Sequence, residues 1–115
     1  MVKSISITSP GVICYPLHRH SFCEIMYYTK GTGFLKTEYG DYPFSPGTAI
    51  IVPPNVLHGS VSESGFKNIS VGGSFDNIII GDKPISVTSA ADAAVLGGLI
   101  YKNRFSSAEY LNILA

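Results

Sequence analysis

Charged residues are scarce in this sequence of 115 residues, and neither sign is in excess. Asp, Glu, Lys and Arg together make up 14% of the chain, and eight basic residues balance eight acidic ones. A protein that binds nucleic acid needs a Lys or Arg for each phosphate that it neutralises. Any contact with DNA is therefore expected outside these residues. The low charge also favours a surface that is partly covered in an interface with another chain or domain.

The sequence also lacks the signals of disulfide bonds, secretion and membrane spans. The two cysteines, Cys14 and Cys23, are too few for a disulfide framework and match no zinc-binding spacing. The first ten residues lack the apolar core of a secretory signal. The longest nearly apolar run, residues 93–101, is far shorter than the roughly 20 residues that span a bilayer. We therefore expect a cytoplasmic protein with no contact to a membrane, folded as one domain.

Short strands are indicated over residues 1–88. Segments rich in β-branched and aromatic residues, such as "FCEIMYY", "FLKTEY", "TAIIV" and "FKNISV", alternate with turn signals such as "KGTG", "YGDYPFSPG" and "VPPN". Many short strands with closely spaced turns are typical of a β-sandwich or a barrel. The fold is therefore predicted to be mainly β.

The character of the sequence changes after that point, and residues 89–115 are predicted to form one or two helices. From Ser89 onward, apolar residues follow one another at helical spacing, namely Val95, Leu96, Leu99 and Ile100. Such helices either cover an open end of the barrel or form a dimer interface and a mechanical link to a further domain. The sequence stops at Ala115 inside an apolar helical pattern without a C-cap, so we expect a truncation before that domain.

Two of the three histidines lie together in the stretch "HRHSFCE", which begins at His18. In an extended strand, successive side chains point to opposite faces. If residues 18–28 form one strand, the even-numbered side chains share a face, and these are His18, His20, Phe22, Glu24, Met26 and Tyr28. The large apolar members of this set either fill the interior of a small barrel or line a ligand pocket.

Two imidazoles and a carboxylate on one face predict a metal site. Imidazole suits Zn, Cu, Fe and Ni, and a carboxylate extends the range towards Mn. The remaining histidine, His58, follows a Pro-Pro-Asn turn at residues 53–55, which can bring it across to the first strand. A divalent transition metal (Zn, Ni, Fe or Mn) is thus expected at His18, His20, Glu24 and His58. The alternative is that these side chains pack, form hydrogen bonds or contact an organic effector.

The same residues resemble the two motifs of the cupin family. His18-x-His20-x3-Glu24-x6-Gly31 resembles the first motif, and "PPNVLH" resembles the second, with Asn55 where the family usually has glycine. The order of further motifs resembles more narrowly the sensor domains of the arabinose-operon regulator (AraC) family. These motifs are Glu24-Ile25, Gly31-Thr32-Gly33, Pro46-Gly47 and Pro53…His58.

This resemblance implies a cupin-like jelly-roll barrel, a double-stranded β-helix, that binds a small-molecule effector and forms a homodimer. Its output would be a DNA-binding helix-turn-helix domain that these residues do not include. Catalysis is not implied. A stand-alone metal-dependent cupin enzyme, of dioxygenase or isomerase type, is the alternative, although Tyr28 is the only obvious proton donor on the metal-binding face. A third possible function is that of a structural dimerisation module whose barrel is filled by its own side chains.

Overall fold

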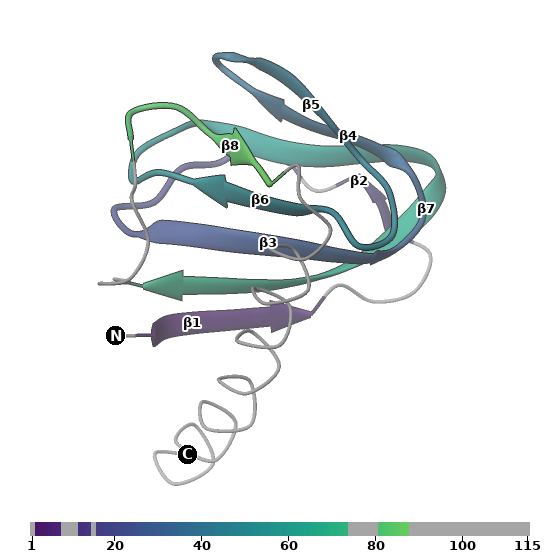
Figure 1. The fold of residues 1–115 in the computed structure, drawn as a ribbon, viewed down its shortest axis with the longest axis horizontal. Coiled ribbons are helices and arrows are strands. Elements are labelled where there is room, and N and C mark those ends of the chain that lie inside the picture. The colour runs from purple at the N-terminus through teal and green to yellow at the C-terminus, as the bar shows by residue number, and fades with distance from the viewer. Residues whose placement is uncertain (1, 8–11, 15, 74–80, 88–115) are drawn as a thin grey trace, which may run out of the picture.

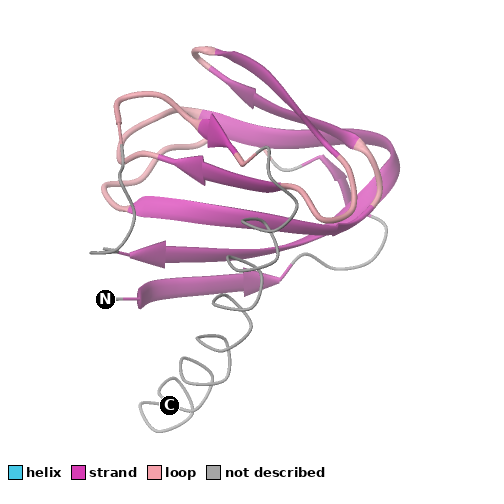
Figure 2. Cartoon of the chain, in the orientation of Figure 1, coloured by secondary structure: helices cyan, strands magenta, loops and turns pink. Residues whose placement is uncertain are grey.

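The computed structural model describes residues 2–7, 12–14, 16–73 and 81–87, and every regular element in these ranges is a β-strand (Figure 2). The strands are β1 (Val2–Ile7), β2 (Val12–Cys14), β3 (Cys23–Lys30), β4 (Gly33–Thr37), β5 (Gly40–Phe44), β6 (Ala49–Val52), β7 (His58–Gly73) and β8 (Ile85–Ser86). The mainly β prediction is confirmed. The predicted helices of residues 89–115 lie outside the described residues. No helix able to span a membrane occurs in the described part.

Strand β7 joins two sheets into a jelly-roll barrel (Figure 1). Its first residues pair with β4, which pairs with β5, while β2 pairs with β7 near the bend between the sheets. Its last residues lie between β1 and β3, and β3 continues through β6 to β8. All of these pairings are antiparallel, so that one long strand holds both walls of the barrel together.

Alternation along β3 produces two apolar clusters, one on each face of its sheet. Met26 and Tyr28 point into the inner cluster, whereas Cys23 and Ile25 point into the outer one. The inner cluster consists of Met26, Tyr28, Leu35, Phe44, Ile50, Val52, Val56 and Phe66. The outer cluster consists of Cys23, Ile25, Ile51, Ile69 and Val71. Burial on both faces explains why "FCEIMYY" is apolar almost throughout.

The predicted strand over residues 18–28 is wrong at its beginning. The strand starts at Cys23, and the five residues before it contain only an isolated bridge between His18 and His58. The backbone of this segment forms hydrogen bonds with residues 55 and 58, whereas β6 pairs only from Glu24 onward. The segment therefore crosses towards the start of β7. A period of two in the sequence does not distinguish such a crossing segment from a strand.

The turn before β7 depends on an asparagine in the left-handed conformation. Asn55 has a φ of 64°, and it stands where the second cupin motif usually has glycine. Asn tolerates this conformation better than other residues with a side chain. The expected role of Asn55 in the turn is thus confirmed, and the departure from the motif leaves the turn intact.

Substitution of Asn55 tests this conformational requirement. Asn55→Gly is expected to change the free energy of unfolding by less than about 0.5 kcal/mol, whereas Asn55→Ala is expected to lower it by about 1–2 kcal/mol. Urea denaturation of the three proteins measures the difference. Equal stability of the alanine and glycine variants would show that the left-handed conformation is not required.

The centre of the barrel contains a buried hydroxyl pair. The Tyr28 hydroxyl lies 2.7 Å from Ser60 Oγ, and both side chains are buried. The Tyr28 ring stacks on Phe44 with a centroid separation of 3.8 Å. Tyr28→Phe is expected to lower the free energy of unfolding by about 1–2 kcal/mol, because the Ser60 hydroxyl loses its partner in a dry site. Exposed Tyr39 is the matched control, and Tyr39→Phe is expected to change stability by less than about 0.5 kcal/mol in the same denaturation series.

Candidate metal centre

Three segments of the chain bring the predicted metal ligands together. His18 and His20 lie in the segment before β3, Glu24 is the second residue of β3, and His58 is the first residue of β7. One possible ligand atom from each residue lies within 4.8 Å of those of the other three. We call these four residues the His–Glu cluster. His58 and Glu24 form its buried floor, and His18 and His20 lie on its half-exposed side.

Backbone hydrogen bonds hold the cluster in place. The His18 N–H donates to the His58 carbonyl, and the His58 N–H donates to the His18 carbonyl, each at 2.9 Å. The Asn55 N–H donates to the His20 carbonyl at 2.7 Å. The side-chain carboxylate of Glu38 also accepts the Leu57 N–H at 3.0 Å and so fixes the loop that leads to His58. The side chains therefore meet because the two loops are bonded to each other.

All three histidines are oriented in the same way. The Nδ1 atom of each lies at hydrogen-bond distance from a backbone carbonyl two residues away. These bonds run from His18 to Pro16 (2.9 Å), from His20 to Phe22 (3.0 Å) and from His58 to Val56 (2.7 Å). Because a carbonyl only accepts, each Nδ1 must carry the hydrogen. In a neutral imidazole, Nε2 is then the atom with the lone pair, which is how histidines that bind metals are usually held.

The Nε2 atoms of two of these histidines face the carboxylate. His20 Nε2 lies 2.8 Å from Glu24 Oε2, and His58 Nε2 lies 3.5 Å from Glu24 Oε1. The second distance is too long for a good hydrogen bond. His58 is fully buried, and its Nε2 has no hydrogen-bond partner among the described residues. Acceptors that face one another in a buried site require a cation between them, either a proton or a metal ion.

Without a metal, a proton partly fills this role. Burial raises the pKa of Glu24, but the nearby His58 and His20, the latter also hydrogen-bonded to the carboxylate, outweigh it, and the net pKa lies below the ordinary 4.5. Burial lowers the pKa of His58, but the Glu24 carboxylate and the Val56 carbonyl outweigh it, and the net pKa lies above the ordinary 6.5. The protonated imidazole and the ionised carboxylate therefore stabilise each other.

The residues of the His–Glu cluster fit a divalent transition metal. Three imidazoles and one carboxylate are a donor set that suits Zn, Ni, Fe and Mn. Metal–ligand bonds of about 2.0–2.2 Å hold the donor atoms about 3–4 Å apart, so the longest separations, up to 4.8 Å, require a small inward movement. Cys23 is not a candidate ligand, because it belongs to the outer cluster and burial raises the pKa of its thiol to about 11.

The other residues predicted to line a ligand site lie on two sides of the cluster. The Phe22 ring stacks on His20, with a centroid separation of 4.2 Å and an interplanar angle of 9°. Met26 and Tyr28 follow Glu24 into the barrel and are packed in the inner cluster. A direct contact between these three side chains and an effector remains a prediction. The carbonyls that orient the imidazoles were missed, because the sequence marks them only by their position two residues from each histidine.

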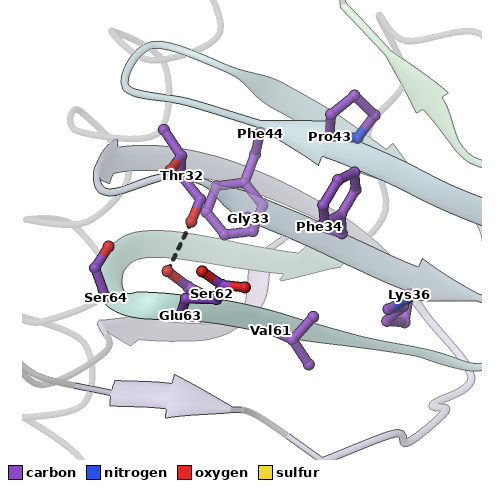
Figure 3. A pocket seen from close by; sticks show the side chains of 10 residues that line it. All are labelled: Thr32, Gly33, Phe34, Lys36, Pro43, Phe44, Val61, Ser62, Glu63 and Ser64. Carbon is purple, nitrogen blue, oxygen red and sulfur yellow. Dashed lines mark hydrogen bonds between the residues drawn. The ribbon is translucent and has the colours of Figure 1, made fainter.

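A second hollow lies on the outer surface of the barrel, over β4, β5 and the first half of β7 (Figure 3). Its volume is about 720 Å³, and exposed Phe34 and Pro43 and half-exposed Lys36 contribute to its wall. The Ser62 hydroxyl at its inner end donates to the Thr32 carbonyl at 2.6 Å. Two of the polar side chains here are already paired with the protein, since Ser62 bonds to the Thr32 carbonyl and Lys36 lies 2.7 Å from Asp41. The His–Glu cluster, where the buried His58 Nε2 has no hydrogen-bond partner among the described residues, is therefore the better candidate site.

A β-barrel with this cluster at one end defines the chain as a cupin-type ligand-binding domain. The family model of the AraC-like ligand binding domain matches residues 8–77, and the chain belongs to this family. The resemblance seen in the motifs is thus confirmed. A comparison with curated proteins found no significant match.

Solved structures agree on the fold. ToxT from Vibrio cholerae with a bound unsaturated fatty acid is similar at a TM-score of 0.63 and 13% identity, over 96% of this chain and 50% of that one. The apo form of a ToxT variant is similar at a TM-score of 0.54 and 11% identity, over 85% of this chain and 46% of that one. An RmlC-like cupin from Shewanella frigidimarina is similar at a TM-score of 0.50 and 20% identity, over 65% and 71%. This chain thus spans about half the length of ToxT.

Proposed function

We propose that this chain is the effector-binding and dimerisation domain of a bacterial AraC-type transcriptional regulator that acts in the cytoplasm. The effector binds at the His–Glu cluster, and a DNA-binding helix-turn-helix domain outside these residues provides the output. The observation that carries this proposal is the convergence of four ligand atoms within 4.8 Å, at one end of a barrel whose family is defined by ligand binding. The similarity to ToxT, a protein about twice as long, supports the existence of a further domain.

Binding at this position has a physical route to a response. The cluster joins the segment before β3, β3 itself and the start of β7. A ligand that contacts all three segments favours the arrangement in which they are close together. Such a preference is what couples ligand binding to a distant DNA-binding domain.

Thermal unfolding with a panel of candidate effectors tests the proposed function. Sugars, small carboxylates, fatty acids and divalent metals are each added to the purified chain, and at least one class is expected to raise the melting temperature. His58→Ala is expected to abolish that shift. Light scattering is expected to give the mass of a dimer. A monomer whose melting temperature responds to no compound would contradict the proposal.

A metal-dependent cupin enzyme is the second candidate function, supported by the donor set and by the similarity to an RmlC-like cupin. Its expected proton donor, Tyr28, is fully buried and hydrogen-bonded to Ser60. Burial also raises the pKa of Tyr28, which makes proton release more difficult. Turnover of a substrate by the metal-loaded chain, lost in Glu24→Gln, would favour the enzyme over the sensor.

A further inference from the structure

Resting on the proposed function, we propose that the effector is a divalent transition-metal ion itself, bound reversibly by His18, His20, Glu24 and His58. The domain then senses metal availability, and no organic molecule has to enter the barrel. The inference concerns which kind of ligand is the signal, and three features of the described residues carry it.

The first feature is the size of the space between the ligand atoms. One possible ligand atom from each of the four residues lies within 4.8 Å of the others, a spacing that a single metal ion can bridge. A sugar or a fatty acid contacts such a cluster only from outside, because its carbon skeleton does not fit between the donors. One ion can be bound by all four residues at once, and it gives a partner to His58 Nε2, which has none among the described residues.

The second feature is the packing of the barrel interior below the cluster. Phe44 stacks on Tyr28 at a centroid distance of 3.8 Å and meets Phe66 edge-on at 5.5 Å. Leu35 and Ile50, which complete this layer, are fully buried. A pocket for an organic molecule usually has about 300–1,000 Å³. Such a molecule would have to displace these side chains, whereas an ion at the cluster leaves them in place.

The third feature is what the ion would join. His18 and His20 belong to the crossing segment of residues 16–22, which is bonded to the start of β7 through the His18–His58 bridge. Across this junction His20 Nε2 and His58 Nε2 lie 2.8 Å and 3.5 Å from the two oxygens of the Glu24 carboxylate. A metal ion bound by these side chains adds direct bonds that link the crossing segment, β3 and β7. Metal occupancy therefore decides how firmly residues 16–22 are closed onto the barrel.

Hydrogen exchange measured by mass spectrometry tests the inference on this chain. The protein is treated with EDTA, and Zn²⁺, Ni²⁺ or Mn²⁺ is then added at about 100 times its Kd. One ion is expected to bind per chain, and EDTA is expected to remove it again without unfolding. Exchange in residues 16–22 and 53–58 is expected to slow by up to about 100-fold, because the ion binds only the closed form. Exchange at the tip of the β4–β5 hairpin is expected to remain unchanged.

Two variants with the same chemical change control the experiment. Glu24→Gln removes the charged ligand and is expected to lose the protection, whereas Glu63→Gln, at an exposed position of β7, is expected to retain it. Circular dichroism checks that both variants fold. If Glu24→Gln does not fold, half-exposed His18→Asn provides the same test and is expected to weaken metal binding by about 100-fold or more.

The outcomes separate this inference from the proposed function. If no metal binds but an organic compound raises the melting temperature, the inference is overturned and the sensor function stands. If the metal is removed only by unfolding, it is a permanent cofactor and not a signal, and the inference is again overturned. If neither metals nor organic compounds bind, the inference and the proposed function both fail. Reversible binding with protection of residues 16–22 supports the inference.

Discussion

The affinity of the His–Glu cluster for Zn²⁺ is expected to rise about tenfold with each unit of pH up to the raised pKa of His58, and to level off above it. The cause is competition, because His58 Nε2 must lose its proton before it binds a metal ion. The neighbouring carboxylate makes this proton harder to remove, since it raises the pKa of His58 above 6.5. Isothermal titration calorimetry at several pH values, in buffers of different ionisation enthalpy, measures both the affinity and the protons released.

The metal-free protein is expected to respond to pH in the opposite sense. The pKa of His58 is raised on folding, so its contribution is fully present below pH 6.5 and is lost as the pH rises through the higher folded value. The pKa of Glu24 is lowered, so its contribution is present above pH 4.5 and is lost as the pH falls through the lower folded value. Stability without metal should thus be greatest between about pH 4.5 and pH 6.5.

A matched variant identifies the source of both effects. Glu24→Gln removes the charge that raises the pKa of His58, so the loss of stability above pH 6.5 is expected to become smaller in this variant. Glu63→Gln should behave like the unmodified protein. Zinc affinity that does not depend on pH, measured in the unmodified chain, would mean that no proton leaves the site and that His58 is not a ligand.

Phe44→Ala is expected to lower the free energy of unfolding by about 3–5 kcal/mol, because it removes a buried aromatic ring and leaves a cavity. Phe44 is buried in the inner cluster, where it stacks on Tyr28 and contacts Phe66. The same ring covers Gly33, where no side chain would fit. Neighbouring residues therefore have little freedom to fill the space that the ring leaves.

Phe34 provides the comparison, since it belongs to the adjacent strand but points to the outer surface and is 47% exposed. Phe34→Ala is expected to change the free energy of unfolding by less than about 1 kcal/mol. Guanidinium denaturation of both variants measures the difference. A similar, small loss in both would show that the barrel interior is loosely packed and leaves room for an organic ligand.

The sequence predicted the barrel well because its signals are local. Proline and glycine turns, β-branched strands and a left-handed Asn55 all act within a few residues. The convergence of His18, His20, Glu24 and His58 was also predicted, but partly for a wrong reason. Alternation along one strand was the argument, whereas the two histidines belong to a crossing segment that is bonded to the loop before His58.

Other aspects of the site depend on contacts that no local pattern encodes. The carbonyls of Pro16, Phe22 and Val56 orient the imidazoles, and every residue type has a carbonyl, so the sequence cannot single them out. The outward groove over Phe34 was not foreseen either, because it depends on the register between β4, β5 and β7. The shape of such a groove depends on which residues of distant strands are paired. Periodicity within one segment carries no information on that pairing.

The pairing of β5 has a consequence for how copies of this protein can meet. Pro43 lies opposite Phe34 in β4 and has no N–H to exchange, so this pair has its hydrogen-bonding sides turned apart. The missing N–H of Pro43 therefore lies on the side of β5 that faces away from β4, at the outer margin of the sheet. An additional strand on that side would find no hydrogen-bond donor there. Asp41, also on this margin, carries a charge that it shares with Lys36. Proline and charge at a sheet margin discourage strand addition. A dimer is expected to use another surface, and β5 protects the protein from growing into an extended, fibre-like sheet.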